Sequence, residues 1–452
     1  LDNNTTGAAN TGVGYNSLGA NTTANNNTAL GAYTLEDNTT GTALVAVGAG
    51  ALKNNTTASN NVAVGLDALM FNTTGADNTA VGNEALKRVT TGGYNVAMGA
   101  NAGDEISAGS YNIAIGKSAL RAVQTTGNNV AIGASALERY TGASNTAVGT
   151  SALAFCTGGT GNTAVGLQAG YDVTTAVQGV YVGAYAGTNV TTGNNNVYLG
   201  YNAGAASTNG TPNVAIGVSA YSQATGGADN VAIGPNALLS CDGGAFYNTA
   251  VGAGAGYYVS TGDYNIAIGR AADQVTTNGG PNICIGASSK PSAAGGSHQI
   301  AIGYNVTTNG NNNFTFGNGS TDTSCDFGST TWNLPSDERI KEEIEDDVIG
   351  LSFINDLRPR TFRYRKEKDI PDSLESYVAD SEERFRNDKY QHGFIAQEVK
   401  EAIDKHNLKD GFDMWSESET DGRQLVGPTA VIPMLIKAIQ ELSAEVEKLK
   451  GA

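Results

Sequence analysis

The chain has 452 residues, of which 60 are glycine and 9 are proline; 15% are charged, and the formal net charge is −17. Average proteins contain about half this share of glycine and about a quarter charged residues, so the composition excludes an ordinary globular chain and a proline-rich disordered linker. The acidic balance argues against binding to nucleic acid or anionic membranes, and no apolar run approaches the roughly 20 residues of a membrane span.

Glycine and charge are distributed unevenly along the chain. Residues 1–335 contain 54 glycines and only 24 charged residues, whereas residues 336–452 contain 6 glycines and 45 charged residues. We therefore expect two structurally different parts that meet near Pro335.

A five-residue motif of the form NVAIG recurs through the first part, and its glycine returns at intervals of 17 residues in most cases. Nineteen copies align between Gly14 and Gly317. Apolar, mostly β-branched residues alternate with alanine before the glycine, which is the period-two pattern of a short strand. One copy cannot bury an apolar face by itself, so the repeat predicts a mainly β fold. We expect a β-solenoid or β-roll of about 19 rungs over residues 1–317, with a rod about 90 Å long.

Two columns of the aligned repeat predict how the rungs interact. Asparagine stands four residues before the glycine in 16 of the 19 copies, where it suits a recurrent bend and a ladder of amide hydrogen bonds. Alanine at the middle of the strand leaves a flat apolar stripe, which we expect to contact another copy of the chain. The alternative is that this face forms the thin interior of a two-sided roll. The repeat also resembles the head repeats of trimeric autotransporter adhesins, which read S/N-x-A-I/V-G, although the period here is longer.

The C-terminal segment 431–452 predicts a helix. Its apolar residues follow at steps of four and three, which is the seam of a short coiled coil; they are Leu435, Ile439, Leu442, Val446 and Leu449. A seam shorter than three heptads is marginal by itself, so we expect it to trimerise together with an attached domain.

Three motifs occur in order in the second part: S-D-E-R-I-K from Ser336, G-F-I-A-Q-E-V from Gly393 and L-I-K-A-I-Q-E-L from Leu435. Together they resemble the intramolecular chaperone domain at the end of phage endosialidases, tail spikes and neck appendages. The same module also occurs in some eukaryotic membrane-bound transcription regulators. The resemblance implies a small α/β chaperone domain over residues 336–430 and a trimerising coiled-coil helix over 431–452. Between the rod and this domain we expect a linker over 318–335 that leads to a cleavage site.

The resemblance implies that three chains assemble and then cleave themselves at the Pro335–Ser336 bond. Ser336 would be the nucleophile and Lys341 the general base, because a hydroxyl needs a base to accept its proton and a buried lysine can do so. An N→O acyl shift followed by ester hydrolysis is one route, and attack by a neighbouring chain is another. Residues five apart are not aligned on a helix, so the pair requires a turn near Asp337. The alternative role for Ser336 is a helix N-cap, since acids follow it as at a helix start; the two roles are compatible.

Metal and cofactor chemistry finds little support in the sequence. The four cysteines, Cys156, Cys241, Cys284 and Cys325, lack C-x-x-C spacing, and the chain contains only three histidines. We therefore predict no metal site and no cofactor.

The sequence predicts a homotrimeric extracellular fibre, specifically a phage tail fibre or related virion appendage, whose only enzymatic activity is a single self-cleavage. We expect two further copies of the chain and a host-surface receptor or glycan as partners, and neither nucleic acid nor membrane insertion. The alternatives are a bacterial or eukaryotic surface adhesin with the same chaperone, and a polysaccharide-binding tailspike. Near-identical rungs can pair out of step, so a distinct terminal domain that sets their register has a physical purpose.

Overall fold

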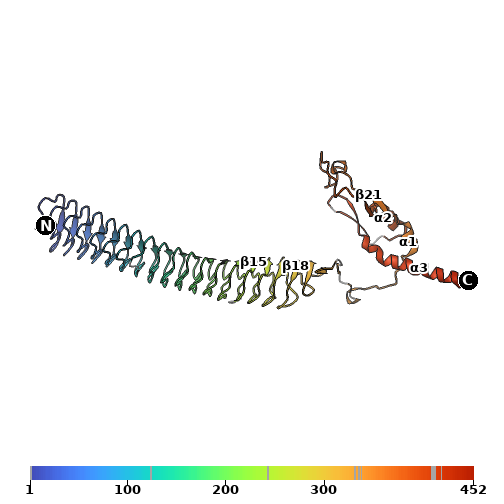
Figure 1. Ribbon diagram of the computed structural model, residues 1–452, viewed down its shortest axis with the longest axis horizontal. Helices are drawn as coiled ribbons and strands as arrows, with labels where there is room; N and C mark the ends of the chain where they lie inside the picture. The colour runs from blue at the N-terminus through green and yellow to red at the C-terminus, as the bar shows by residue number, and fades with distance from the viewer. Residues whose placement is uncertain are drawn as a thin grey trace. The chain divides into compact units, whose positions relative to one another are not determined.

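The computed structural model describes residues 3–122, 125–241, 244–329, 332–333, 336, 338–408, 414–418 and 420–451. The chain divides into two compact units, an N-terminal unit of residues 1–335 and a C-terminal unit of residues 336–452. Figure 1 colours the N-terminal unit from blue to orange and the C-terminal unit from orange to red.

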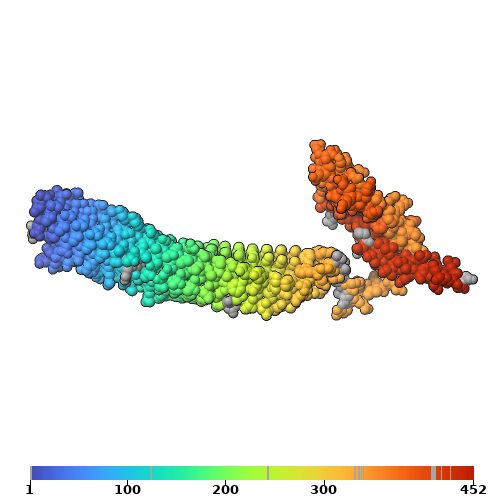
Figure 2. Space-filling model, in the orientation of Figure 1, coloured from blue at the N-terminus to red at the C-terminus, as the bar shows by residue number. Residues whose placement is uncertain are grey.

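The N-terminal unit is a β-solenoid in which each coil carries one short strand (Figure 1). Space-filling atoms show the coils stacked into a continuous rod (Figure 2). In the described residues, 19 parallel strands follow one another in chain order: β1 (Thr11–Val13), β2 (Thr28–Leu30), β3 (Val45–Val47), β4 (Val62–Val64), β5 (Thr79–Val81), β6 (Val96–Met98), β7 (Ile113–Ile115), β8 (Val130–Ile132), β9 (Thr146–Val148), β10 (Thr163–Val165), β11 (Val180–Val182), β12 (Val197–Leu199), β13 (Asn213–Ile216), β14 (Asn230–Ile233), β15 (Thr249–Val251), β16 (Ile266–Ile268), β17 (Asn282–Ile285), β18 (Gln299–Gly303) and β19 (Asn313–Gly317).

Equivalent residues of neighbouring coils lie opposite one another in the sheet. Val62 pairs with Thr79, and Ala63 pairs with Ala80, so one coil corresponds to 17 residues. The predicted β-solenoid with this repeat is therefore confirmed.

The middle residue of each strand points into the solenoid. Ala63, Ala80 and Ala97 have no exposed surface, whereas the flanking residues Val96 and Met98 are 36% and 50% exposed. The prediction that the alanines form an outer stripe against another copy is wrong, and the alternative of a thin interior is correct. A short coil encloses so narrow a core that only a methyl group fits at the centre of most strands.

The turn after each strand fills the space beside the alanine, usually with a leucine such as Leu52, which is fully buried. In five coils this position is glycine instead, and in two of these, at Gly187 and Gly204, Tyr181 and Tyr198 replace the alanine. A Cβ at Gly187 would lie 2.4 Å from the Tyr181 ring. In these two coils the pair of alanine and leucine is replaced by tyrosine and glycine, which keeps the core volume similar.

Buried asparagines connect successive coils. Oδ1 of Asn95 accepts the main-chain N–H and the side-chain amide of Asn112, both at 3.0 Å. Nδ2 of Asn95 donates to the carbonyl oxygen of Gly109 at 2.9 Å and to Oδ1 of Asn78 at 3.0 Å. The column predicted as an amide ladder thus forms one, and it also satisfies main-chain groups at the bend before each strand.

An antiparallel strand ends the sheet. β20 (Thr323–Asp326) pairs with β19, and Trp332 lies against the rings of Phe314 and Phe316, with ring centroids 5.8 and 5.5 Å apart. Part of the stretch 318–335 that we took as a linker is therefore folded. A capped edge prevents the last parallel strand from pairing with another chain.

The C-terminal unit contains short helices and two hairpins. In the described residues its elements are the 3-10 turn η1 (Glu338–Ile340), α1 (Leu351–Asp356), β21 (Arg360–Phe362), η2 (Glu367–Asp369), β22 (Gln391–Gly393), α2 (Ala396–Lys405), β23 (Trp415–Glu417), β24 (Gln424–Val426), η3 (Pro428–Val431) and α3 (Ile432–Lys450). β21 pairs antiparallel with β22, and β23 with β24. This small domain with a terminal helix agrees with the predicted fold class.

Residues of all three α-helices form the core of the C-terminal unit, including Phe353 on α1, Val399 on α2 and Met434 on α3. Oε2 of Glu441 on α3 accepts the main-chain N–H of Leu351 at 2.7 Å. A carboxylate at the start of α1 satisfies an N–H that has no partner within the helix.

The predicted coiled-coil seam of α3 lies uncovered in the single chain. Its five residues, hereafter the helix seam, are between 40% and 79% exposed: Leu435, Ile439, Leu442, Val446 and Leu449. No helix in the described residues is both long and apolar enough to cross a membrane.

Candidate functional site

The structure brings the predicted nucleophile and base together. Nζ of Lys341 donates a hydrogen bond to Oγ of Ser336 at 2.7 Å. The turn that allows this contact is η1, in which the main-chain N–H of Lys341 donates to the carbonyl oxygen of Glu338 at 3.1 Å. Because the chain forms this single 3-10 turn and does not continue as an α-helix, the two residues are not held on the separate faces that an α-helix would give them.

Both side chains of this pair are exposed in the single chain. A solvated ammonium group does not accept a proton, so the pair in this environment is a hydrogen-bonded dyad without the burial that base catalysis requires. Pro335, the other side of the predicted scissile bond, and Asp337 lie outside the described residues.

The helix start that would make Ser336 an N-cap is not formed. After η1, residues 342–349 have no regular secondary structure, and the first α-helix of the unit begins at Leu351. The acids at 342–347 therefore belong to an irregular stretch, in which Glu343 has a φ of +52°.

The N-terminal unit presents an apolar outer surface along its strands, hereafter the sheet face. It consists of the outward residues on either side of each central alanine. Examples between 37% and 50% exposed are Leu30, Met98, Ile132, Leu199 and Ile302. The sheet face and the helix seam are long, largely apolar surfaces of the described residues, and such surfaces mark interfaces.

A groove of about 1000 Å³ lies between the two hairpins of the C-terminal unit. β22, β24 and the start of α2 line it, together with four arginines: Arg363, Arg365, Arg386 and Arg423. Phe362, Phe385 and Phe394 also line this arginine groove, and no carboxylate does among the described residues. We did not predict it from the sequence, although arginine and aromatic residues alternate at 362–365.

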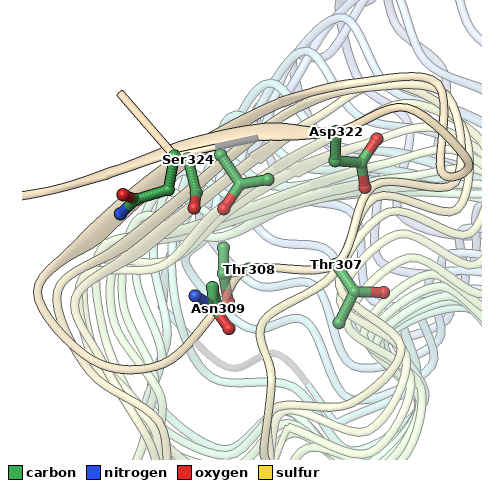
Figure 3. A pocket seen from close by; sticks show the side chains of 7 residues that line it. Thr307, Thr308, Asn309, Asp322 and Ser324 are labelled. Carbon is green, nitrogen blue, oxygen red and sulfur yellow. The ribbon is translucent and has the colours of Figure 1, made fainter. Parts of the chain in front are cut away.

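A second cavity, of about 300 Å³, lies at the capped end of the solenoid (Figure 3). The labelled side chains are all polar, with Thr308 and Asn309 on one side and Ser324 on the strand opposite. Several of its groups are already bonded within the cap: Thr308 Oγ1 donates to Gln299, and Asp322 Oδ1 accepts the main-chain N–H of Gly319 at 2.7 Å. The cavity is thus largely satisfied by the cap itself.

Cysteine and acidic side chains do not assemble into a metal centre in the part of the chain that the structure describes. All four cysteines are buried, and none is in a disulfide bond. Burial raises the pKa of the Cys156 thiol to about 11, and burial also raises the pKa of Cys284. Such thiols are poor nucleophiles, and we interpret them as small core residues.

Residues 336–408 match the sequence model of a protein family described as the chaperone of endosialidase. The matched stretch begins at Ser336 and includes Lys341, β21, β22 and α2. The match confirms the family resemblance for this part of the chain, so the rod is joined to an intramolecular chaperone domain. No curated protein and no solved structure gives a significant match to the chain.

Proposed function

We propose that the chain is one protomer of a homotrimeric fibre whose C-terminal unit assembles the trimer and then separates itself by cleavage before Ser336. The observation that carries this proposal is the presence of two uncovered apolar surfaces, one on each unit, in a chain that also carries an endosialidase-type chaperone domain. A partner must cover both surfaces, and two further copies of the chain offer matching ones.

The helix seam supports a parallel bundle of three α3 helices. Ile439 and Leu449 are 66% and 79% exposed, whereas Met434 and Ala438 face the core of their own unit. The helix therefore has one face for its domain and one face for partners, as coiled-coil packing requires.

The sheet face does not by itself fix the register in which three rods associate. Its residues repeat every 17 positions, so two rods displaced by one coil would bring nearly the same residues into contact. A slipped pair is then a kinetic trap of almost native energy. A terminal domain that joins three chains before the rods associate removes this ambiguity.

Cleavage follows from the chemistry of the Ser336–Lys341 dyad. Oγ of Ser336 attacks the carbonyl carbon of Pro335, and Nζ of Lys341, once deprotonated, accepts the hydroxyl proton. The C–N bond breaks, the amine of Ser336 takes up a proton, and the acyl group rests on Oγ as an ester. Water hydrolyses the ester, which leaves a carboxylate on Pro335 and restores the hydroxyl. If Ser336 of a neighbouring chain attacks instead, the same bonds form and break. Because Lys341 is exposed in the single chain, we expect cleavage to wait for assembly.

The setting that we propose is a phage tail fibre or related virion appendage that contacts a host-surface receptor or glycan. The length of the solenoid and the removable chaperone suit a projecting shaft, since loss of the chaperone after assembly would make unfolding difficult to reverse.

The test compares the full chain with Ser336→Ala and Lys341→Met, and uses Lys389→Met as a control at an exposed lysine outside the dyad. On a denaturing gel we expect the wild type and the control to give a fragment of about 13 kDa, with the remainder of the 46.2 kDa chain as the second band. Both dyad variants should stay full length, and native mass spectrometry should show three chains in each protein.

Full-length wild-type protein that is trimeric would overturn the cleavage step alone. A wild-type chain that stays monomeric at micromolar concentration would overturn the assembly function itself.

A further inference from the structure

Two of the four arginines in the arginine groove, Arg386 and Arg423, have no ion-pair partner among the described residues, whereas Arg363 pairs with Asp388 at 3.5 Å. The Arg386 guanidinium lies 5.4 Å from the centroid of the Tyr364 ring, and Nη1 of Arg423 donates to Oγ of Ser376 at 3.1 Å. Nε of Arg423 is buried without a hydrogen-bond partner. Among the described residues, neither Arg386 nor Arg423 forms an ion pair through its guanidinium; the nearby Asp421 accepts the main-chain N–H of Arg423 at 3.1 Å. A guanidinium with one buried N–H that has no partner, beside an exposed guanidinium without an ion pair, points to an anionic occupant.

The same unit contains a segment with the complementary character. Residues 342–348, hereafter the acidic segment, have the sequence EEIEDDV and are exposed throughout. Ile344 and Val348 are 63% and 86% exposed. Within the described part of the chain, residues 342–348 make no main-chain hydrogen bond. A stretch with free peptide groups and exposed aliphatic side chains is suited to pair with another strand.

The groove also offers strand edges. In the described part of the chain, β22 pairs with β21 alone and β24 with β23 alone, so each hairpin keeps an open edge. Both β22 and β24 line the groove. An extended segment laid between them can add main-chain hydrogen bonds, while its carboxylates meet arginines and its aliphatic residues meet Phe385 and Phe394.

We propose that the acidic segment of each copy docks into the arginine groove of the neighbouring copy. This inference rests on the proposed homotrimer. The donor segment and the acceptor groove are different surfaces, so the contact is head-to-tail, and a threefold rotation closes it into a ring in which every segment and every groove is used once. The segment of the same chain is not among the residues that line its own groove. Each copy would therefore bind the next through a charged interface with a unique register, which the repetitive rod lacks.

The experiment uses the full chain with Ser336→Ala, so that the C-terminal unit stays attached. One variant reverses the groove (Arg386→Glu with Arg423→Glu), a second reverses the segment (Glu345→Lys with Asp346→Lys), and a third combines both. A control changes the same amount of charge at exposed carboxylates elsewhere, Asp372→Lys with Glu401→Lys.

Sedimentation over a concentration series gives the apparent dissociation constant of the trimer. We expect either single reversal to raise it at least about tenfold, and the combined variant to restore most of the loss. The control should leave it within about threefold, because separated exposed charges are screened by salt.

A second measurement does not depend on charge reversal. Oxidation of a chain with Ile344→Cys and Leu425→Cys should give disulfide-linked dimers and trimers, since Leu425 lines the groove and is 45% exposed. Ile344→Cys with Val378→Cys is the matched control, because Val378 is 49% exposed but lies outside the groove lining.

The failures of the two proposals are distinguishable. The docking would be overturned, and the proposed function left intact, if neither charge reversal changed the apparent dissociation constant of the trimer and the cysteine pair gave only intrachain crosslinks or none. A parent chain that does not trimerise would overturn both. Loss of assembly in the combined variant, with binding of an added anionic polysaccharide to the parent, would also overturn the docking, because the groove would then serve another polyanion.

Discussion

Replacing one asparagine of the buried ladder should weaken the solenoid at a single coil. Asn95→Ala removes an Oδ1 that accepts the main-chain N–H of Asn112 and an Nδ2 that donates to the carbonyl oxygen of Gly109. Asn112 and Gly109 are both buried, so their main-chain groups cannot turn to water instead. The substitution therefore leaves one donor and one acceptor without partners inside the rod.

The expected loss follows from these two groups. A buried main-chain group without a partner costs about 1–3 kcal/mol, and the smaller side chain also leaves a void. We expect the free energy of unfolding to fall by about 2–5 kcal/mol. The matched control is Asn83→Ala in the same region, because Asn83 is exposed, and it should change stability by less than about 0.5 kcal/mol.

The assay is urea unfolding followed by circular dichroism, with all proteins at one concentration because trimerisation contributes to apparent stability. Hydrogen exchange should locate the damage at residues 109–113. A weak coil can also divide the rod into two cooperative blocks, as expected when each repeat contacts only its neighbours. Equal unfolding midpoints for Asn95→Ala and Asn83→Ala would refute the view that the ladder joins the coils.

Three further predictions concern the interior of the rod. Burial raises the pKa of Asp273, so the native state binds its proton more tightly than the unfolded chain does. This contribution to the stability of the fold is fully present below about pH 4 and is lost as the pH rises through the native pKa. At pH 7 we therefore expect Asp273→Asn to have a free energy of unfolding about 1–3 kcal/mol higher than that of the wild type. A difference of the same size at pH 4 would contradict this prediction. Gly82→Ala should cost at least about 2 kcal/mol, because φ is +141° and a Cβ would lie 2.5 Å from the carbonyl oxygen of Gly99; Gly158→Ala, with its nearest contact at 3.9 Å, should be tolerated in the same thermal scan. Cys156, with its pKa raised to about 11, should resist alkylation until the rod unfolds, and rapid labelling of the native protein in a mass spectrum would disprove its burial.

Periodicity was sufficient to predict the rod because the repeat carries the same local information many times. The glycine column, the asparagine column and the alternation around each alanine all recur every 17 residues, so a chance pattern is excluded. The direction in which the alanine points was mispredicted for a spatial reason. A period-two pattern separates two faces of a strand but does not say which face lies inside, and here the smaller side chain occupies the interior.

The dyad illustrates the opposite case. Ser336 and Lys341 were identified by their place in an ordered set of motifs, and the contact between them depends on η1, which the sequence did not distinguish from a helix start. The arginine groove was missed because its members come from positions as far apart as 363 and 423, which only the packing of two hairpins and α2 brings together.

The sequence by itself determined the repeat length, the β character of the rod, the change of composition near residue 335 and the family of the C-terminal unit. These properties depend on residues close together in the chain, where steric and hydrogen-bonding preferences act directly. The tertiary structure decided which side of each strand is buried, how a tyrosine and a glycine share one coil, and where four arginines meet. Each of these depends on the space that remains after distant segments have packed, and no local pattern records that space.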